Sequence, residues 1–143
     1  MPPTAFYSLS SFGTNYEAYN SRLTSYFGWA PSIGAAPTDH WIQVDLQVQR
    51  FVAAIVTKGL GDGSVSNEYV TSYKIALSDD SIAWSYVTDS RGESLAFTGN
   101  VNRHVVFRNA LPEVVPARYV RLYVVSYEGY PTLRWGVKGC PIA

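Results

Sequence analysis

The chain has 143 residues, of which 47% are hydrophobic and only 15% are charged, so there is ample apolar surface for a core and intrinsic disorder is excluded. Eleven basic and eleven acidic residues cancel, which argues against a nucleic-acid-binding protein. No apolar run reaches the roughly 18 residues of a membrane-spanning helix. We therefore expect residues 1–143 to form one domain without a membrane span.

The stretch from Ser11 to Trp29 is rich in aromatic residues, and tyrosine is the most frequent aromatic type of the chain, with 11 copies. Tyrosine combines an apolar ring with a polar hydroxyl group, and it is therefore common at binding surfaces. The aromatic residues recur at helical spacing, but Gly13, Gly28 and the poor helix formers between them disfavour a helix. We expect packed or partly exposed loops here.

From residue 41 onward, short runs of alternating apolar and polar residues predict β-strands. Such runs are WIQVDL, FVAAIVTKG, YVTSYKIALS, RHVVFRNAL, ARYVRLYVV and TLRWGVKG. Asp79 and Asp80 follow the third run and predict a turn that leads into AWSYVT as a hairpin. Segments rich in glycine, proline and asparagine separate the runs. Short strands at this spacing predict an all-β antiparallel sandwich or barrel.

No catalytic or metal-binding pattern stands out in the sequence. His40 and His104 are the two histidines, and neither lies in a motif such as His-Glu-x-x-His. There is no G-x-S-x-G motif, and Cys140 has no local catalytic signature. We therefore expect no enzyme activity and no cofactor. Calcium binding by backbone carbonyls together with Asp62 stays open, because such a site leaves no linear pattern.

Eight segments in order carry a family resemblance: SRL, GWAP, HWIQVDL, VTKG, YVTSYKIALSDDSIAW, FTGNVN, ARYVRL and LRWGVKGC. The series, from about Ser8 to Cys140, resembles the discoidin family, the F5/8 type C domains of coagulation factors, milk-fat-globule adhesion proteins, neuropilins and contactin-associated proteins. The resemblance implies an eight-stranded antiparallel jelly-roll-like β-sandwich or distorted barrel, with loops called spikes at one end. It also implies an extracellular, non-catalytic attachment domain.

The family's three spikes map onto residues 12–20, 27–39 and 60–68, with residues 98–102 close by. The resemblance places ligand-contacting side chains in or beside these loops, at Phe12, Asn15, Tyr16, Tyr19, Phe27, Trp29, Ile33, Lys58, Leu60, Asp62, Val65, Asn67, Asn100 and Arg103. For Trp29, packing beneath the second spike and ligand contact are both open. The other three tryptophans match structural positions of the family, and we expect them in the core: Trp41, Trp84 and Trp135.

Two departures from the family pattern affect these expectations. Family members usually join their chain ends by a disulfide between an N-terminal cysteine and the position of Cys140, and no N-terminal cysteine is present here. Cys140 is then either a small buried hydrophobe or a cysteine whose disulfide partner lies outside this chain. In the neuropilin-like subgroup a spike aspartate receives a C-terminal arginine, but Gly34 or Ile33 stands at that position, so we do not expect that ligand class.

Two functional hypotheses follow. The first is a secreted or ectodomain cell-adhesion module that binds phospholipid headgroups or cell-surface glycans through its spikes, with an affinity for one copy that is micromolar or weaker. The alternative is a protein–protein adhesion domain that binds a receptor or matrix protein over a flat surface. Exposed tyrosines that cluster at the spike tips favour the first hypothesis, and a cluster on the side of the sandwich favours the second.

Overall fold

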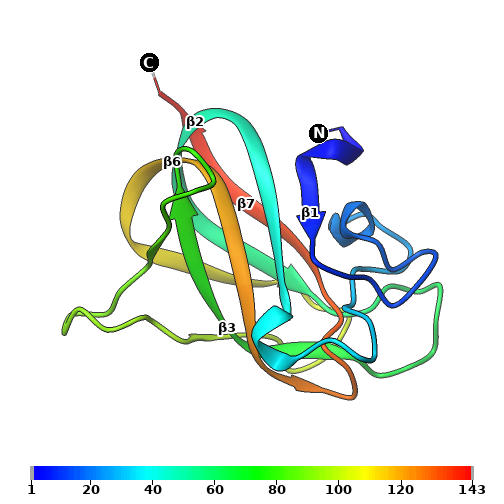
Figure 1. Cartoon of the computed structure of the whole chain (residues 1–143). Helices are drawn as coiled ribbons and strands as arrows, with labels where there is room; N and C mark the ends of the chain where they lie inside the picture. The colour runs from blue at the N-terminus through cyan, green and yellow to red at the C-terminus, as the bar shows by residue number, and fades with distance from the viewer. Residues whose placement is uncertain (1, 143) are drawn as a thin grey trace.

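The computed structural model describes residues 2–142 (Figure 1). In chain order the elements are the 3-10 turn η1 (Pro3–Ala5), β1 (Phe6–Ser8), the 3-10 turns η2 (Ala18–Ser21) and η3 (Pro37–Asp39), β2 (Trp41–Lys58), β3 (Tyr69–Ser78), β4 (Ser85–Tyr86), β5 (Phe97–Thr98), β6 (Phe107–Glu128) and β7 (Arg134–Pro141). The prediction of an all-β fold is confirmed. Within residues 2–142, no helix has the length and apolar character that crossing a membrane requires.

The strands form one antiparallel sheet in the order β1-β2-β6-β3-β4, with β5 paired to β3 and β7 paired to β2. β2 and β6 are the central pair, with Trp41 opposite Tyr123. Their register shifts between Asp45 and Arg50, where Gln47 has a φ of 72°. Such a bulge bends a strand, so the sheet curls around its own core. The family resemblance implies eight strands; the described residues form seven, because β2 and β6 each continue through a bend.

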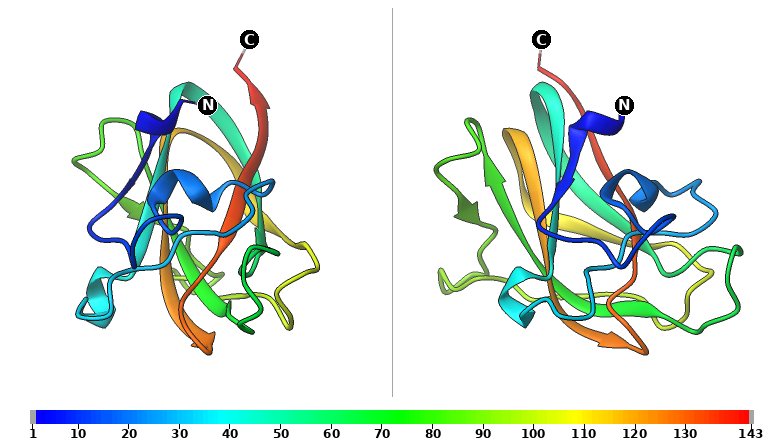
Figure 2. Two further views of the ribbon diagram at one scale, coloured as in Figure 1. Left: turned by 90° about the vertical axis from the view of Figure 1, so that its right-hand side faces the viewer. Right: turned by 45° about the vertical axis from the view of Figure 1, so that its right-hand side comes forward.

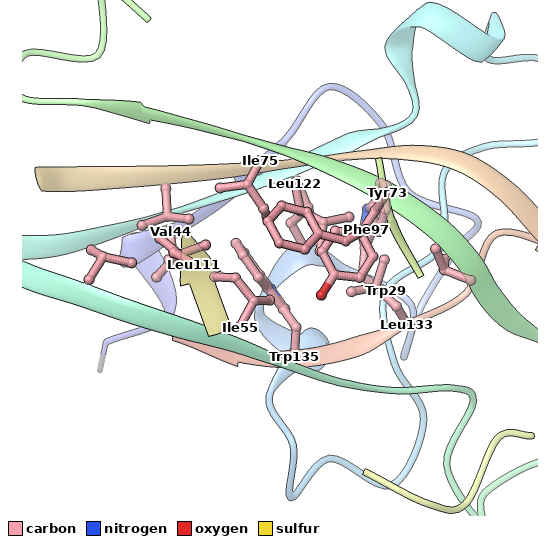
Figure 3. Close-up of a cluster of buried hydrophobic side chains, with 14 of the residues drawn as sticks. Trp29, Val44, Ile55, Tyr73, Ile75, Phe97, Leu111, Leu122, Leu133 and Trp135 are labelled. Atoms are coloured by element: carbon pink, nitrogen blue, oxygen red, sulfur yellow. The ribbon is translucent and has the colours of Figure 1, made fainter. Parts of the chain in front are cut away.

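Side chains from β2, β3, β6 and β7 fill the interior of the curled sheet (Figure 3). Trp135 lies in this cluster, as expected, and Tyr73 stacks on Phe97 with ring centroids 5.4 Å apart. The Tyr73 hydroxyl oxygen accepts a hydrogen bond from Asn109 Nδ2 at 3.0 Å. Burial raises the pKa of Tyr73 to about 12, so its hydroxyl stays neutral at all physiological pH values.

The predicted turn at Asp79 and Asp80 is confirmed. The Asp80 carboxylate accepts the backbone N–H groups of Ile82 and Ala83, each at 2.9 Å. These hydrogen bonds hold the pKa of Asp80 below its usual value. The chain then enters β4, where Tyr86 pairs with Ala76 of β3, so the predicted hairpin is also confirmed.

Residues 9–40, between β1 and β2, form long loops that contain only the two short 3-10 turns η2 and η3. The prediction of loops in place of a continuous helix over residues 11–29 is therefore confirmed. These loops are tied to the opposite end of the chain, because Trp29 and Leu133 exchange two backbone hydrogen bonds of 2.9 Å. Both chain ends lie on the same side of the molecule (Figures 1 and 2).

Candidate functional site

The three predicted spikes lie at one end of the sheet, together with loop 98–106 and with residues 127–132, which are the end of β6 and the turn that follows it (Figure 2). We call this set of loops the spike end. Backbone hydrogen bonds join its loops: Phe12 donates to Ala30 at 2.7 Å, and Gly61 donates to Phe27 at 2.6 Å. Since irregular backbone has no strand ladder to pair with, these bonds satisfy buried groups and hold the loops as one rigid platform.

A buried arginine anchors the platform from below. The Arg134 guanidinium donates to the carbonyl oxygens of Gly59 at 2.8 Å and of Leu23, Ser25 and Arg103 at 3.3 Å each. Desolvation lowers the pKa of Arg134, but an arginine starts so far above neutral pH that it stays charged. Four carbonyl dipoles from three separate loops therefore hold this charge, and the loops depend on it for their relative positions.

A second arginine supports the third spike. Arg103 Nη1 donates to the carbonyl oxygens of Gly61 at 3.1 Å and Ser64 at 2.5 Å. The resemblance places Arg103 among the ligand contacts, but here this side chain shapes the loop that carries Val65. Lys58, the last residue of β2, is half-buried.

Six aromatic rings form a continuous row across the spike end, which we call the aromatic ribbon. Consecutive ring centroids are 5.2 to 6.5 Å apart, and every consecutive pair meets edge to face. This is the favoured geometry for aromatic pairs, because the positive edge of one ring meets the negative face of the next. In order, the rings are Tyr26, Phe27, Tyr16, Phe12, Tyr130 and Tyr127.

The half-buried rings of the ribbon are held in place by the surrounding loops, and the other rings are exposed to solvent. The Tyr130 hydroxyl donates to the carbonyl oxygen of Pro31 at 2.7 Å, and burial raises the pKa of Tyr130. Gly63 packs against the ring of Phe27, where a Cβ atom would come within 2.6 Å of the ring. Phe12, Tyr26 and Tyr127 are exposed. The ribbon is thus a rigid row of rings with three of them available to a ligand.

Apolar side chains also project from three separate loops of the spike end, and we call them the apolar tips. Ile33 of the second spike is 79% exposed, Val65 of the third is 94% exposed, and Val101 of loop 98–106 is 74% exposed. Asn15 and Asn67, which the resemblance also selects, are exposed beside them. Three loops therefore each present an apolar side chain to solvent around the ribbon.

Three of the side chains that the resemblance places at the ligand are buried instead: Trp29, Leu60 and Asn100. Trp29 packs in the core, which is the first of the two alternatives left open for it, and its Nε1 donates to the carbonyl oxygen of Ser10 at 3.0 Å. Asn100 accepts a hydrogen bond of 2.7 Å from the Thr57 hydroxyl and donates to the carbonyl groups of Thr57 and Val105, so it ties its own loop to the end of β2. Leu60 has no exposed surface. All three support the loops from inside and have no surface for a ligand.

Two further predicted contacts lie off the ribbon. The Tyr19 ring meets Phe6 of β1 edge to face at 5.7 Å, and the Arg22 guanidinium lies 3.9 Å above its centroid. Asp62 is exposed, and its Oδ1 lies 3.7 Å from His104 Nδ1. Among residues 2–142, no group of three or more histidine, cysteine, aspartate or glutamate side chains is placed to hold a metal ion.

The sequence pattern does not single out three members of the ribbon: Tyr26, Tyr127 and Tyr130. For Tyr127 and Tyr130, the sequence signal is the segment YEGYP, which has two tyrosines around a turn. Its glycine and proline otherwise indicate only a connection between two strands. Cys140 contradicts one of the two expectations for it, that of a small buried side chain. It is an exposed free cysteine on β7, so the interpretation as a buried hydrophobe is wrong.

A second aromatic surface, separate from the aromatic ribbon, lies on the outer face of the sheet. We call it the side-face patch, and it combines exposed, half-buried and buried rings with one arginine: Tyr7, Trp41, Trp84, Tyr86, Tyr119, Arg121 and Tyr123. Trp41 is buried, as predicted, but beneath this patch and outside the core cluster. Trp84 is half-buried here, whereas the family pattern predicts it in the core. Exposed tyrosines therefore occur both at the spike end and on the side of the sheet.

Arg121 is the centre of the side-face patch. Its guanidinium carbon lies 3.7 Å from the ring centroid of Trp41 and 4.0 Å from that of Trp84. Its Nε and Nη2 atoms donate to Gln43 Oε1 at 3.1 and 2.8 Å. Stacking between two indole rings is among the strongest arrangements for a cation on aromatic faces. The patch is thus an ordered surface.

Comparisons with known proteins agree with this architecture. The F5/8 type C domain profile matches residues 4–137. The chain is 35% identical to lactadherin of Mus musculus over 93% of its own length and 31% of that protein. It is 36% identical to neuropilin-1 of Xenopus laevis over 93% of its own length and 14% of that protein. The chain therefore spans about a third or less of these relatives.

Solved structures show the same fold. Wild-type discoidin II of Dictyostelium discoideum superposes with a TM-score of 0.82 at 19% identity, covering 96% of this chain and 55% of that chain. Chitosan-binding module 2 of a Paenibacillus sp. IK-5 chitosanase/glucanase, crystallised with chitotriose, gives a TM-score of 0.70 at 20% identity, covering 94% of this chain and 95% of that chain. The predicted discoidin-like fold is therefore confirmed.

Proposed function

Because the chain belongs to the F5/8 type C (discoidin) family, a family of non-catalytic binding modules, we propose that it attaches to the phospholipid surface of a cell through its spike end. The apolar tips enter the interfacial layer of the membrane, and the aromatic ribbon lies at the level of the headgroups. Tyrosine suits that depth, because its ring is apolar and its hydroxyl group is hydrated. Residues 1–143 act as one extracellular module in this proposal.

The apolar tips are the observation that carries the proposal. Ile33, Val65 and Val101 are each at least 74% exposed, and they come from three separate loops. Full burial of one such side chain contributes about 1.5–3 kcal/mol, and partial burial in a membrane interface contributes less. A membrane is wide enough to receive several loop tips at once, whereas a small ligand would leave most of them in water. One copy is expected to bind weakly, and linked copies would bind tightly.

The charges of the spike end do not favour an anionic headgroup. Arg103 and Arg134 donate to loop carbonyls, and Arg22 lies on the Tyr19 ring. Glu17 and Glu128 are exposed at the same end. We therefore expect vesicles of phosphatidylcholine alone to bind about as well as vesicles that also contain phosphatidylserine, because the free energy comes from apolar contact rather than charge.

Vesicle sedimentation with a double variant tests the proposal. Replacing Ile33→Ser and Val65→Ser should reduce the vesicle-bound fraction, with the partition coefficient falling at least about tenfold. The matched control is Ile82→Ser, because Ile82 is 84% exposed on the turn at the other end of β3. Both variants should keep the melting temperature of the parent chain, since these side chains have few contacts to lose.

Three results would overturn the membrane proposal. Equal losses for the double variant and the Ile82→Ser control would show that the spike end is not the contact surface. Binding on a glycan array without any vesicle binding would assign the spike end to a carbohydrate, with the exposed rings Phe12 and Tyr26 as stacking surfaces. Absence of binding in both assays would leave no role for the spike end in attachment.

The side-face patch favours a second function, adhesion to a receptor or matrix protein. Tyrosine, tryptophan and arginine are the residue types enriched in the energetic centres of protein interfaces. Tyr7 and Tyr86 are exposed within the patch. If this surface holds a protein partner, Tyr7→Ser with Tyr86→Ser should reduce cell adhesion to the immobilised chain and leave vesicle sedimentation unchanged. Unchanged adhesion would remove this candidate.

A further inference from the structure

A cleft of about 540 Å³ lies at the end of β3 that is opposite the spike end. Three segments line it: the end of β3 at residues 77–79, β4 with the chain that follows it at residues 85–90, and the bend of β6 at residues 112–117. We call it the base cleft. β3 begins directly after the third spike and ends at the base cleft, so the whole length of this strand separates the two sites (Figure 1). The volume lies within the roughly 300–1,000 Å³ of protein ligand sites.

The base cleft is acidic. Asp79, Asp89 and Glu113 line it, and no lysine, arginine or histidine does. Asp89 Oδ1 accepts two backbone N–H groups of its own turn, and the exposed Arg91 reaches its other carboxylate oxygen only at 3.9 Å. Asp79 accepts a hydrogen bond of 3.1 Å from Gln49 Nε2. The cleft therefore attracts a cation and disfavours an anion.

The floor of the cleft is apolar, which defines the ligand further. Leu77, Val87 and Val115 are half-buried along it, and Pro112 and Pro116 contribute their rings. Lysine and arginine side chains combine an aliphatic stem with a charged head, so the stem fits an apolar floor while the head reaches carboxylates. A metal ion would not contact the apolar floor, and a neutral ligand would leave the three carboxylates without a partner, so both fit the cleft less well.

The edge of the sheet beside the cleft points to a polypeptide. β4, the last strand of the sheet, consists of Ser85 and Tyr86 and among the described strands pairs with β3 alone. The chain that follows it already pairs with residues 93–95, through Leu95 N–H to the Val87 carbonyl at 2.9 Å, so the unpaired edge is limited to these two residues. An unpaired edge offers backbone N–H and C=O groups to an extended segment, which is a common mode of peptide recognition. In an extended segment every second side chain points the same way, so alternate basic residues would face the cleft.

We infer that the base cleft binds an extended basic polypeptide segment along the edge of β4, with its lysine or arginine side chains directed at Asp79, Asp89 and Glu113. The inference is independent of the proposed membrane function, because none of these residues belongs to the spike end. Since the two sites lie at opposite ends of β3, both are open at the same time. The module would then link a basic partner to the surface that the spike end holds.

A fluorescence anisotropy titration tests the inference. The probe is a labelled peptide of alternating lysine and threonine residues, and the acceptor is the full chain. The double variant Asp79→Asn and Glu113→Gln should raise the Kd about five- to tenfold, because it removes two of the three charges and keeps the side-chain shapes. The matched control is Glu128→Gln, which removes an exposed carboxylate at the spike end and should leave the Kd unchanged. Added salt should weaken binding of the parent chain.

Any of three outcomes of the titrations would overturn the inference, and a competition experiment adds a fourth: no peptide binding by the parent chain, an unchanged Kd for the double variant, or equal binding of a peptide of alternating glutamate and threonine. Spermine serves as a competitor that has the charge but no peptide backbone. Displacement by spermine at the same charge concentration would overturn the polypeptide as the occupant, because the β4 edge would then contribute nothing. Vesicle sedimentation of the double variant should match that of the parent chain, so failure of this inference is distinguishable from failure of the membrane proposal.

Discussion

The spike end and the side-face patch each contain an arginine that pairs with no carboxylate of the described residues. The groups that stabilise the guanidinium charge differ between the two regions. At the spike end, Arg134 is surrounded by carbonyl oxygens of loops. In the side-face patch, Arg121 lies between the rings of Trp41 and Trp84 and donates to the Gln43 amide oxygen. One guanidinium is held by backbone and the other by side chains.

The difference follows from the secondary structure around each arginine. Loops leave backbone carbonyls without a ladder partner, so a buried guanidinium at the spike end satisfies groups that would otherwise be unpaired. In the strands of the side face the ladder already pairs the carbonyls, so Arg121 meets side chains instead: ring faces, the Gln43 amide oxygen and the Tyr123 hydroxyl. Arg134 therefore decides whether the spike end has a defined shape, whereas Arg121 adjusts one surface of a sheet that is formed without it.

The largest expected effect is that of Arg134→Met. The change leaves four carbonyl groups without their donor, so the free energy of unfolding should fall by about 3 kcal/mol or more. Urea denaturation followed by tryptophan fluorescence measures this loss, and vesicle binding should fall with it because the spike end loses its shape. The control is Arg91→Met, which changes an exposed arginine and should stay within about 0.5 kcal/mol of the parent. A small loss for Arg134→Met would contradict the role given to this residue.

A somewhat smaller effect is expected for Gly61→Ala, which tests how tightly the loops of the spike end contact one another. A Cβ atom at this position would lie 2.6 Å from the Tyr26 carbonyl carbon. The two loops must therefore move apart, and the hydrogen bond from the Gly61 N–H to the Phe27 carbonyl lengthens or breaks. We expect a loss of about 2 kcal/mol in the free energy of unfolding. Gly13→Ala is the control on the first spike, since nothing lies within 4 Å of its added Cβ. Equal stability of the two variants would mean that the loops adjust freely.

Arg121→Lys sharpens the other side of the comparison. Lysine keeps the charge but cannot stack its head between two indole rings, so the free energy of unfolding should fall by about 1 kcal/mol. The near-ultraviolet circular dichroism of Trp41 and Trp84 should change, while vesicle binding stays at the parent level. A loss as large as that for Arg134→Met would contradict the distinction between the two arginines.

The smallest effect concerns pH and the ion pair on the side of the sheet. Arg118 Nε lies 2.9 Å from Asp45 Oδ1, and this hydrogen bond holds the pKa of Asp45 below its usual value of about 3.8. A carboxyl group with a lowered folded-state pKa stabilises the fold above its unfolded-state pKa, and the contribution is lost as pH falls through the lowered value. Arg118→Gln should therefore move the acid-unfolding midpoint to a higher pH. Arg108→Gln, at an exposed arginine, serves as the control and should not move it.

The strands were predictable because their signal is local. The alternation in WIQVDL and YVTSYKIALS depends only on neighbouring residues, and Asp80 forms its turn with groups two and three residues away. The resemblance added the positions of the spikes. The bends that keep β2 and β6 continuous were not predictable, because the positive φ of Gln47 reflects the curl of the whole sheet.

The members of the site were only partly predictable, because long-range contacts decide which rings are exposed. Trp29 is buried by its pairing with Leu133, more than a hundred residues later in the chain. Tyr130 joins the aromatic ribbon because its hydroxyl group reaches Pro31, 99 residues earlier. Neither contact leaves a mark on the local sequence pattern. The sequence therefore located the loops, but it did not separate the supporting side chains from the presented ones.

The pairing of β7 also bears on how the protein responds to mechanical load. Every residue of β7 has a partner on β2, from Arg134 at the loops to Pro141 near the chain end, and the one register shift leaves Ala53 of β2 without a partner on β7. A pull on this chain end, against a surface gripped at the loops, runs along the strand. The backbone hydrogen bonds between β7 and β2 are then loaded in shear and must break together rather than one by one. We therefore expect a high force to be needed to unfold the domain in this direction.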